Sequence, residues 1–319
     1  MRNYKYDNLK TIMMFCVIFG HCLELIEGEI SRKMYILIYT FHMPVFVFIT
    51  GYLAKSNKEK IFKYIKIYLI WQTIYCLYDK YFLNIECFIR YLIPNRFMWY
   101  IMAMIIWFWG LKLFDIEEEK IAKVLLIYSF VFSIVCGFFD ELGYMFSMSR
   151  IITFLPYFIF GYYSKKFKWN IETLKNNKRN IIIFSIILAI SITYFLLIID
   201  NLNPLWLYGS YSYENGNYSF IFKIMWILLS ICELFIFLSI IPNKKINIIS
   251  TVGTTTLCTY LLHGFIIKIF EFKVVIFNFS EYINIILALV ISIIILILFG
   301  IFLPNVLLKI KNKQIIIID

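Results

Sequence analysis

The chain has 319 residues and a formal net charge of +11, and 62% of its residues are hydrophobic whereas only 16% are charged. An average soluble domain is about half apolar and about a quarter charged, so this composition excludes an ordinary soluble fold. The apolar residues form long runs, such as 181–199 and 283–303, that match the roughly 20 residues a helix needs to cross lipid. We therefore expect an all-α, polytopic membrane protein.

Ten hydrophobic segments predict about ten transmembrane helices, because backbone groups in lipid must form hydrogen bonds within their own segment. In chain order the segments are 6–23, 34–54, 62–81, 97–114, 121–138, 150–164, 181–199, 219–241, 252–270 and 282–308. Residues 2–22 have the composition of a signal peptide without its cleavage site, so we expect a retained first helix. We interpret the longest connections, 82–96, 165–180 and 200–218, as polar linkers, and residues 1–319 as a single membrane-embedded domain.

The distribution of basic residues predicts the topology. With the amino terminus in the cytoplasm, 22 of the 31 Lys and Arg residues fall in the inner segments. This bias follows the positive-inside rule, and it predicts that both termini are cytoplasmic. It also accounts for the net charge, so we expect no nucleic-acid partner.

Seven cysteines, at positions 16, 22, 76, 87, 136, 232 and 258, show no metal-ligand spacing, and we predict no metal site. We interpret most of them as small buried hydrophobic residues. In the predicted topology Cys22, Cys87 and Cys136 lie near the outer side, where one disulfide is conceivable.

The three histidines, His21, His42 and His263, all lie within or at the edge of a predicted span, in its outer half. Each alone is explained equally well as a packed polar residue, but their shared level favours a functional site, because polar side chains in lipid are costly. Lys10 precedes His21 by 11 residues, which places both on one helix face about 16 Å apart. Asp7 lies close to this stripe. A stripe of this kind could line a conduit, but without further context the spacing favours Asp7 and Lys10 as interfacial anchors.

Further candidates lie near the outer side. Glu24 follows His21 by three residues, a spacing that allows its carboxylate to orient the imidazole ring. Arg150 lies at the outer start of the sixth predicted span, and Trp99 and Tyr100 lie at the start of the fourth, where aromatic residues are also typical of a membrane interface. Glu233 lies within the eighth span, and the sequence assigns it no role.

Five segments in order resemble the acyltransferase 3 family of membrane proteins, particularly the branch related to fucose 4-O-acetylases. The first, YDNLKTIMMFCVIFGHCLE (6–24), opens with an acid and a basic residue and ends its apolar helix in His. The others are FHMPVFVFITGYL (41–53), MWYIMAMIIW (98–107), SRIITFLPYFIFGYYSKK (149–166) and TTTLCTYLLHGFIIKIF (254–270).

This resemblance implies a multi-pass enzyme of the bacterial cytoplasmic membrane. Its members transfer an acyl group, usually acetyl, from cytoplasmic acyl-CoA to a hydroxyl group of a cell-surface or lipid-linked polysaccharide. Acetyl-CoA, or another acyl-CoA, is then a donor substrate, and no bound cofactor is expected. By motif position His21 corresponds to the proposed catalytic histidine, Asp7 to the acid and Lys10 to the basic residue. The family usually has Arg at the basic position, and Lys cannot form the bidentate contact that Arg makes.

The expected chemistry is general-base catalysis by His21, assisted by Glu24, because an imidazole can take a proton from a hydroxyl near neutral pH. A covalent relay through acylated His21 is equally compatible. The expected catalytic residues are His21, Asp7 and Glu24, and the expected substrate-binding residues are Lys10, His42, Trp99, Tyr100, Arg150 and His263. Lys10, Lys55 and Lys58 are expected to hold the donor phosphates.

Two other classes compete with this interpretation. A transporter or flippase for polysaccharide or lipid-linked sugar would also have about ten spans and intramembrane charges, but we find no duplicated halves in the sequence. A membrane sensor or scaffold would leave the three outer-half histidines unexplained.

The predicted topology is tested by cysteine labelling from outside the cell. We expect an impermeant maleimide to label Asn215→Cys, in the outer connection, and to leave Asn176→Cys, in an inner connection, unlabelled. The reverse pattern would contradict the topology.

Overall fold

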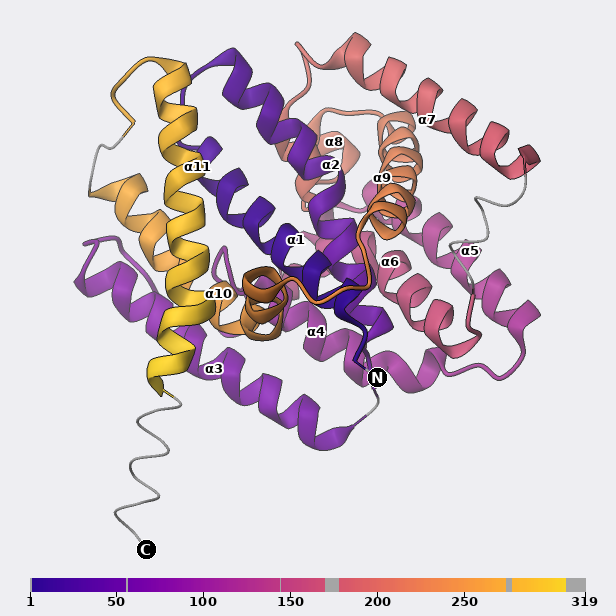
Figure 1. The fold of residues 1–319 in the computed structure, drawn as a ribbon, viewed down its shortest axis with the longest axis horizontal. Helices are drawn as coiled ribbons and strands as arrows, with labels where there is room; N and C mark the ends of the chain where they lie inside the picture. Colours follow the sequence, from indigo (N-terminus) through magenta and orange to yellow (C-terminus); the bar gives the residue numbers. More distant parts are fainter. Residues whose placement is uncertain (1, 56, 144, 170–177, 274–276, 308–319) are drawn as a thin grey trace, which may run out of the picture. The chain divides into compact units, whose positions relative to one another are not determined.

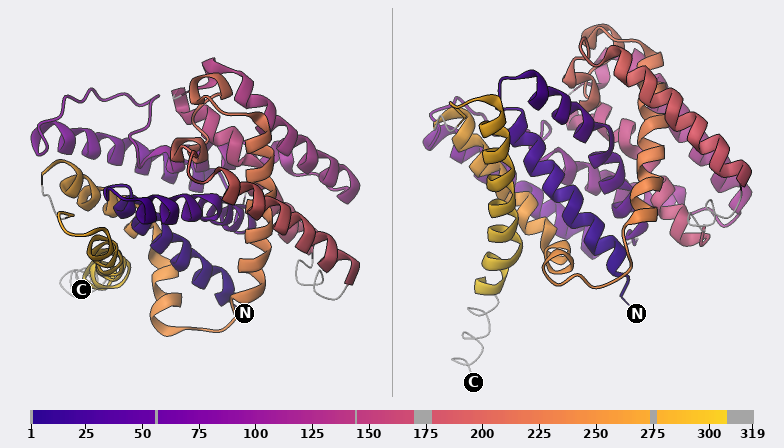
Figure 2. Two further views of the ribbon diagram at one scale, coloured as in Figure 1. Left: turned by 90° about the horizontal axis from the view of Figure 1, so that it is seen from above. Right: turned by 45° about the horizontal axis from the view of Figure 1, so that its top comes forward.

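The computed structural model describes residues 2–55, 57–143, 145–169, 178–273 and 277–307. This part of the chain consists of helices and their connections and contains no strand (Figures 1 and 2). Its long helices are α1 (Tyr4–Leu23), α2 (Glu29–Tyr52), α3 (Lys58–Tyr81), α4 (Trp99–Gly110), α5 (Glu119–Val135), α6 (Met148–Lys166), α7 (Lys178–Ile198), α9 (Phe220–Ile240), α10 (Asn247–Phe272) and α11 (Glu281–Ile297). One further α-helix, α8 (Tyr213–Gly216), is a single turn.

Each of the ten predicted hydrophobic segments corresponds to one of these long helices, so the all-α prediction is confirmed. Five helices in the described part are long and apolar enough to cross a membrane: α2, α5 extended to Phe138, α9, α10, and α11 extended to Leu307. The polytopic prediction is therefore confirmed, whereas ten spans and cytoplasmic termini stay predictions. Asn176 and the basic residues at 309–313 lie outside the described residues.

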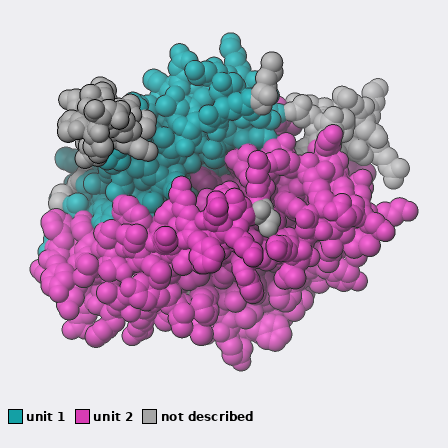
Figure 3. Space-filling model, turned by 90° about the horizontal axis from the view of Figure 1, so that it is seen from below, with its two compact units in different colours: residues 1–38, 240–319 teal, residues 39–239 magenta. Residues whose placement is uncertain are grey.

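The chain divides into two compact units, coloured separately in Figure 3. Unit 1 comprises residues 1–38 and 240–319, and unit 2 comprises residues 39–239. Helix α2 contributes residues to both. The interpretation of the chain as a single domain stays a prediction.

Unit 1 is built on the pair α1 and α10, with α11 packed against both. Gly253 of α10 lies so close to α1 that a Cβ atom at this position would be 2.0 Å from the carbonyl oxygen of Asp7. Beside this contact, the Ser250 hydroxyl donates a 2.7 Å hydrogen bond to the Asn8 side-chain oxygen. Small residues and interhelical hydrogen bonds of this kind are the usual means by which membrane helices associate.

Unit 2 is organised around α6, which contacts α4 and α5 and crosses α2 closely. At the crossing, a Cβ atom on Gly51 would lie 1.9 Å from the Phe158 carbonyl oxygen, and one on Gly161 would lie 2.0 Å from that of Phe48. The two glycines therefore allow direct backbone packing of α2 against α6.

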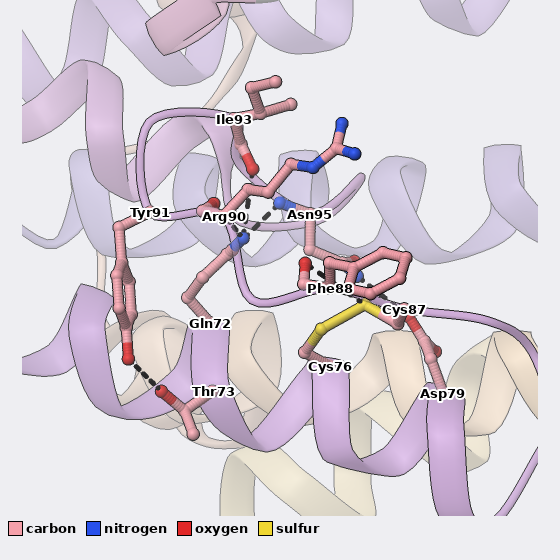
Figure 4. Close-up of a disulfide and its surroundings, with 10 residues drawn as sticks. All are labelled: Gln72, Thr73, Cys76, Asp79, Cys87, Phe88, Arg90, Tyr91, Ile93 and Asn95. Atoms are coloured by element: carbon pink, nitrogen blue, oxygen red, sulfur yellow. Dashed lines mark hydrogen bonds between the residues drawn. A yellow bond between two sulfur atoms is a disulfide. The ribbon is translucent and has the colours of Figure 1, made fainter.

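A disulfide joins Cys76 of α3 to Cys87 in the connection that follows (Figure 4). Cys76 is buried, as expected for most of the cysteines, but it forms a disulfide, and its partner Cys87 pairs with neither Cys22 nor Cys136. The sequence did not indicate this pair, whose members are 11 residues apart, because Cys87 reaches Cys76 only when the chain folds back along the helix. The other cysteines are free, and four of them are buried as predicted: Cys16, Cys22, Cys136 and Cys232.

The same connection is held along α3 by buried polar side chains, which Figure 4 shows. The Gln72 amide donates to the carbonyl oxygens of Arg90 and Ile93, both at 3.0 Å, and Asn95 donates to Asp79 at 3.0 Å. Gln72, Cys76 and Asp79 share one face of α3 because they are four and three residues apart. The connection is thus an ordered part of unit 2.

Because α1 and α10 are in backbone contact at Gly253, we expect one methyl group added there to destabilise the fold. Gly253→Ala would place Cβ against a backbone oxygen that cannot rotate away, and such overpacking typically costs about 1–3 kcal/mol. We expect a lower midpoint of thermal unfolding in detergent. Gly110→Ala is the matched control, because its Cβ would make only an ordinary 3.5 Å contact with the Phe114 ring. Equal midpoints for both variants would contradict the proposed role of Gly253.

Candidate active site

The predicted site residues fall into two groups. Unit 1 holds the residues of α1, α10 and the turn after α1, namely Asp7, Lys10, His21, Glu24 and His263. Unit 2 holds the remainder, namely His42, Trp99, Tyr100 and Arg150.

His21 and His263 come together in unit 1. Helices α1 and α10 run in the same direction, since Asp7 near the start of α1 meets Gly253 and His21 near its end meets His263. The two imidazole rings stack with centroids 5.8 Å apart and an interplanar angle of 26°. Two histidines from segments more than 200 residues apart in sequence thus form one pair.

The tautomer of His263 follows from its hydrogen bond. Its side chain is fully buried, and Nδ1 lies 2.6 Å from the carbonyl oxygen of Tyr260. A carbonyl oxygen can only accept, so Nδ1 carries the hydrogen and the neutral ring has its lone pair on Nε2. Tyr260 therefore orients a basic nitrogen, a role that sequence spacing alone did not reveal.

Glu24 orients the imidazole ring of His21 in a similar way. Its Oε2 lies 3.5 Å from His21 Nδ1, and the two side chains are 28% and 17% exposed. An ionised carboxylate only accepts hydrogen bonds, so this contact also favours hydrogen on Nδ1 and the lone pair on Nε2. Although 3.5 Å is long for a hydrogen bond, catalytic hydrogen bonds often shorten when the substrate binds. The arrangement can accept a proton from a substrate hydroxyl group.

Asp7 and Lys10 lie at the other end of α1. The buried Asp7 carboxylate is 2.7 Å from Arg2 Nε and 2.9 Å from Lys10 Nζ, so it is neutralised by two cations. At 1.5 Å per residue, Asp7 is about 21 Å along the helix from His21, and the structure does not bring the two together. A catalytic role for Asp7 and a substrate-binding role for Lys10 stay predictions.

In unit 2, Arg150 lies between aromatic rings. Its guanidinium carbon is 5.3 Å from the centroid of the Trp99 ring and 5.4 Å from that of Tyr208, and its Nε donates to the Ser210 hydroxyl. The rings restrain the planar cation through cation–π contacts. Trp99 and Arg150, two predicted residues, are therefore neighbours.

Tyr39 connects His42 to these residues, and we call Arg150, Trp99, Tyr208, Tyr39 and His42 the Arg150 cluster. The Tyr39 ring packs edge-on against His42, with centroids 4.5 Å apart, and lies 5.5 Å from the Tyr208 ring. Sequence analysis did not find Tyr39 or Tyr208. Tyr208 belongs to the connection 200–218, whose interpretation as a polar linker is wrong for the 3₁₀ helix Pro204–Tyr208. The aromatic residues of this stretch were the feature of the sequence that could have indicated a packed segment here.

Tyr100 and Glu233 occupy the interior of unit 2. Tyr100 is 3% exposed and its hydroxyl pairs with that of Thr50, so it packs beside Trp99 with its polar atom directed to α2. The Glu233 carboxylate accepts a 2.9 Å hydrogen bond from Thr40, while its second oxygen has no hydrogen-bond partner among the described residues. We assign Glu233 no role. Within the described ranges, no group of three or more His, Cys, Asp and Glu side chains is placed to hold a metal ion.

The helices and the comparisons together define the class of this protein. The described chain is helical, and five of its helices can cross a lipid bilayer, so it is a multi-pass membrane protein. The acyltransferase 3 family model, described as "Acyltransferase domain", matches residues 3–303. The chain belongs to this family and is an acyltransferase that transfers groups other than aminoacyl groups. No curated protein and no solved structure matches the chain.

The Arg150 contacts predict how the connection 200–218 is held. Arg150→Gln removes the cation between the rings of Trp99 and Tyr208, so we expect faster chymotrypsin cleavage near Tyr208 in the otherwise folded protein. Arg90→Gln is the control, because its exposed side chain removes the same charge without these contacts. Equal cleavage rates in both variants would show that Arg150 does not anchor the connection.

Proposed function

We propose that this acyltransferase is a membrane O-acyltransferase of the bacterial cytoplasmic membrane. It moves an acyl group, typically acetyl, from cytoplasmic acyl-CoA to a hydroxyl group of a cell-surface or lipid-linked polysaccharide. The observation that carries the proposal is the His21–His263 pair, because it supplies oriented bases at the position of the family's proposed catalytic histidine.

Direct transfer from the donor to the acceptor requires only one base. His21 Nε2 takes the proton from the acceptor hydroxyl while that oxygen attacks the thioester carbonyl carbon. The new C–O bond forms, the C–S bond breaks, and the protonated imidazole returns the proton to the CoA thiolate. Glu24 stabilises the transient positive charge on His21 through the Nδ1 contact.

A covalent relay is the second route. His21 Nε2 then attacks the thioester, the C–S bond breaks as the C–N bond forms, and CoA leaves as a thiolate. In the second step the acceptor oxygen attacks the acyl carbon, the C–N bond breaks, and the proton lost by the acceptor hydroxyl is finally returned to the CoA thiolate. While acylated, His21 cannot take the acceptor proton. His263, whose Nε2 carries a lone pair in the stacked pair, then serves as the base.

The Arg150 cluster supports a carbohydrate acceptor. Small-molecule sites are lined mostly by aromatic and apolar groups, with a few polar groups that set orientation. Trp99, Tyr208 and Tyr39 supply the rings, and Arg150 and His42 supply polar groups.

Two contacts support the predicted orientation in the membrane. Disulfides persist in oxidising compartments, so the Cys76–Cys87 bridge favours an external location for the end of α3. The Asn8 amide donates to the carbonyl oxygens of Pro242 and Lys244, at 3.2 and 3.0 Å, so the start of α1 lies beside the connection that precedes α10. Both segments are inner in the topology predicted from the basic residues.

His21 is the residue whose loss should abolish transfer without unfolding the protein. We expect His21→Ala to reduce turnover by about 100-fold or more, because general acid–base catalysis commonly contributes 10²–10⁴-fold. Transfer of labelled acetyl from acetyl-CoA to envelope polysaccharide measures the effect, with protein abundance as the folding check. His42→Ala is the comparison and should cause a smaller loss. Activity above about a tenth of wild type in His21→Ala would contradict this mechanism.

A further inference from the structure

Three lysines gather at one end of unit 2. Lys55 follows the end of α2, Lys60 lies in the first turn of α3, and Lys165 lies in the last turn of α6. The close crossing of α2 and α6 brings their carboxyl ends to one level, where Lys165 Nζ lies 5.8 Å from the centroid of the Tyr52 ring. In the predicted topology this end faces the cytoplasm.

Aromatic rings, rather than carboxylates, hold two of these ammonium groups. Lys60 Nζ lies 4.5 Å from the centroid of the Phe108 ring and 6.0 Å from that of Tyr64. These two rings stack on each other at 5.7 Å, so α3 and α4 form one aromatic surface under the half-buried lysine. Cation–π contacts position an ammonium group but leave its net charge in place.

The charges of this cluster are not neutralised by the described part of the chain. Lys55, Lys60 and Lys165 form no ion pair with any described carboxylate. The adjacent Lys166, by contrast, pairs with both Asp115 and Glu117. Carboxylates are therefore present near this end of α6, but they pair with Lys166 and not with Lys165.

The lysines also repel one another. Burial, followed by repulsion from Lys165, Lys55 and Lys63, lowers the pKa of Lys60. Burial and the nearby Lys55 lower the pKa of Lys165 in the same way. Like charges held together without a counter-ion are unfavourable, and a bound anion would relieve this repulsion.

We propose that Lys55, Lys60 and Lys165 form a phosphate-binding site, and that its ligand is the phosphorylated nucleotide end of the acyl-CoA donor. This inference rests on the proposed function, which makes acyl-CoA the donor. Coenzyme A carries a pyrophosphate and a 3′-phosphate, and several lysines suit such a ligand because each ammonium group is a compact charge with three donors. The amino end of α3 adds the partial positive charge of its helix dipole.

The site differs from the one expected from the sequence. Lys10 is already paired with Asp7, and of the three expected phosphate-binding residues only Lys55 lies close enough to repel both Lys60 and Lys165. A phospholipid headgroup offers the same phosphate chemistry. Three lysines match the several charges of a nucleotide better than the single charge of such a headgroup.

The test is equilibrium binding of CoA to the purified full chain in zwitterionic nanodiscs. We expect Lys60→Gln and Lys165→Gln each to weaken binding about tenfold, as for the loss of one charge-assisted hydrogen bond, and the double variant to weaken it further. Pantetheine, which has no phosphate, should bind all variants equally. Lys60→Arg with Lys165→Arg retains both charges and should retain CoA binding.

Lys123→Gln is the matched control, because it removes one charge from an inner segment where Lys123 pairs with Glu119. Its CoA affinity should equal that of the wild type. If the double Gln variant folds and binds CoA as tightly as the wild type, the lysine site is refuted and the proposed function stands. Loss of co-purifying phosphatidylglycerol from that variant, with unchanged CoA binding, would identify the site as a lipid contact and also refute the proposal. If wild-type protein binds no CoA, the proposed donor itself is wrong.

Discussion

The contact between Gly253 and the Asp7 backbone is the constraint on which unit 1 depends. A side chain at residue 253 would separate α1 from α10, whereas glycine lets the two backbones meet. Because the helices run in the same direction, this contact also determines which residues face each other farther along, where His21 stacks on His263. A single small residue near one end thus positions the proposed reactive groups near the other.

Charged groups in this chain differ in how their charge is compensated. Buried or partly buried ions in membrane proteins are normally paired, as Asp7 is with Arg2 and Lys10. In the lysine cluster at the ends of α2, α3 and α6, aromatic rings contact the ammonium groups of Lys60 and Lys165 without cancelling their charge. A cluster of this kind is better explained by an anionic ligand than by stability.

Contacts within one helix could be read from the sequence, and most contacts between helices could not. Glu24 was expected beside His21 because three residues make nearly one helical turn. No spacing rule relates Arg150 to Tyr208, which contact each other only because the connection after α7 folds over the start of α6. The disulfide partner of Cys87 was missed for a similar reason, since the connection after α3 reverses along the helix.

The sequence by itself determined that the chain is a helical membrane protein, which segments form its long helices, and which family motif contains His21. These properties follow from local composition and periodicity, because lipid requires each segment to satisfy its own backbone hydrogen bonds. Only the tertiary structure decided the His21–His263 stack, the Arg150 cluster and the set of lysines without carboxylate partners in the described chain. Each depends on where glycines allow helices to approach and on how connections fold back, which are properties of packing between segments distant in sequence.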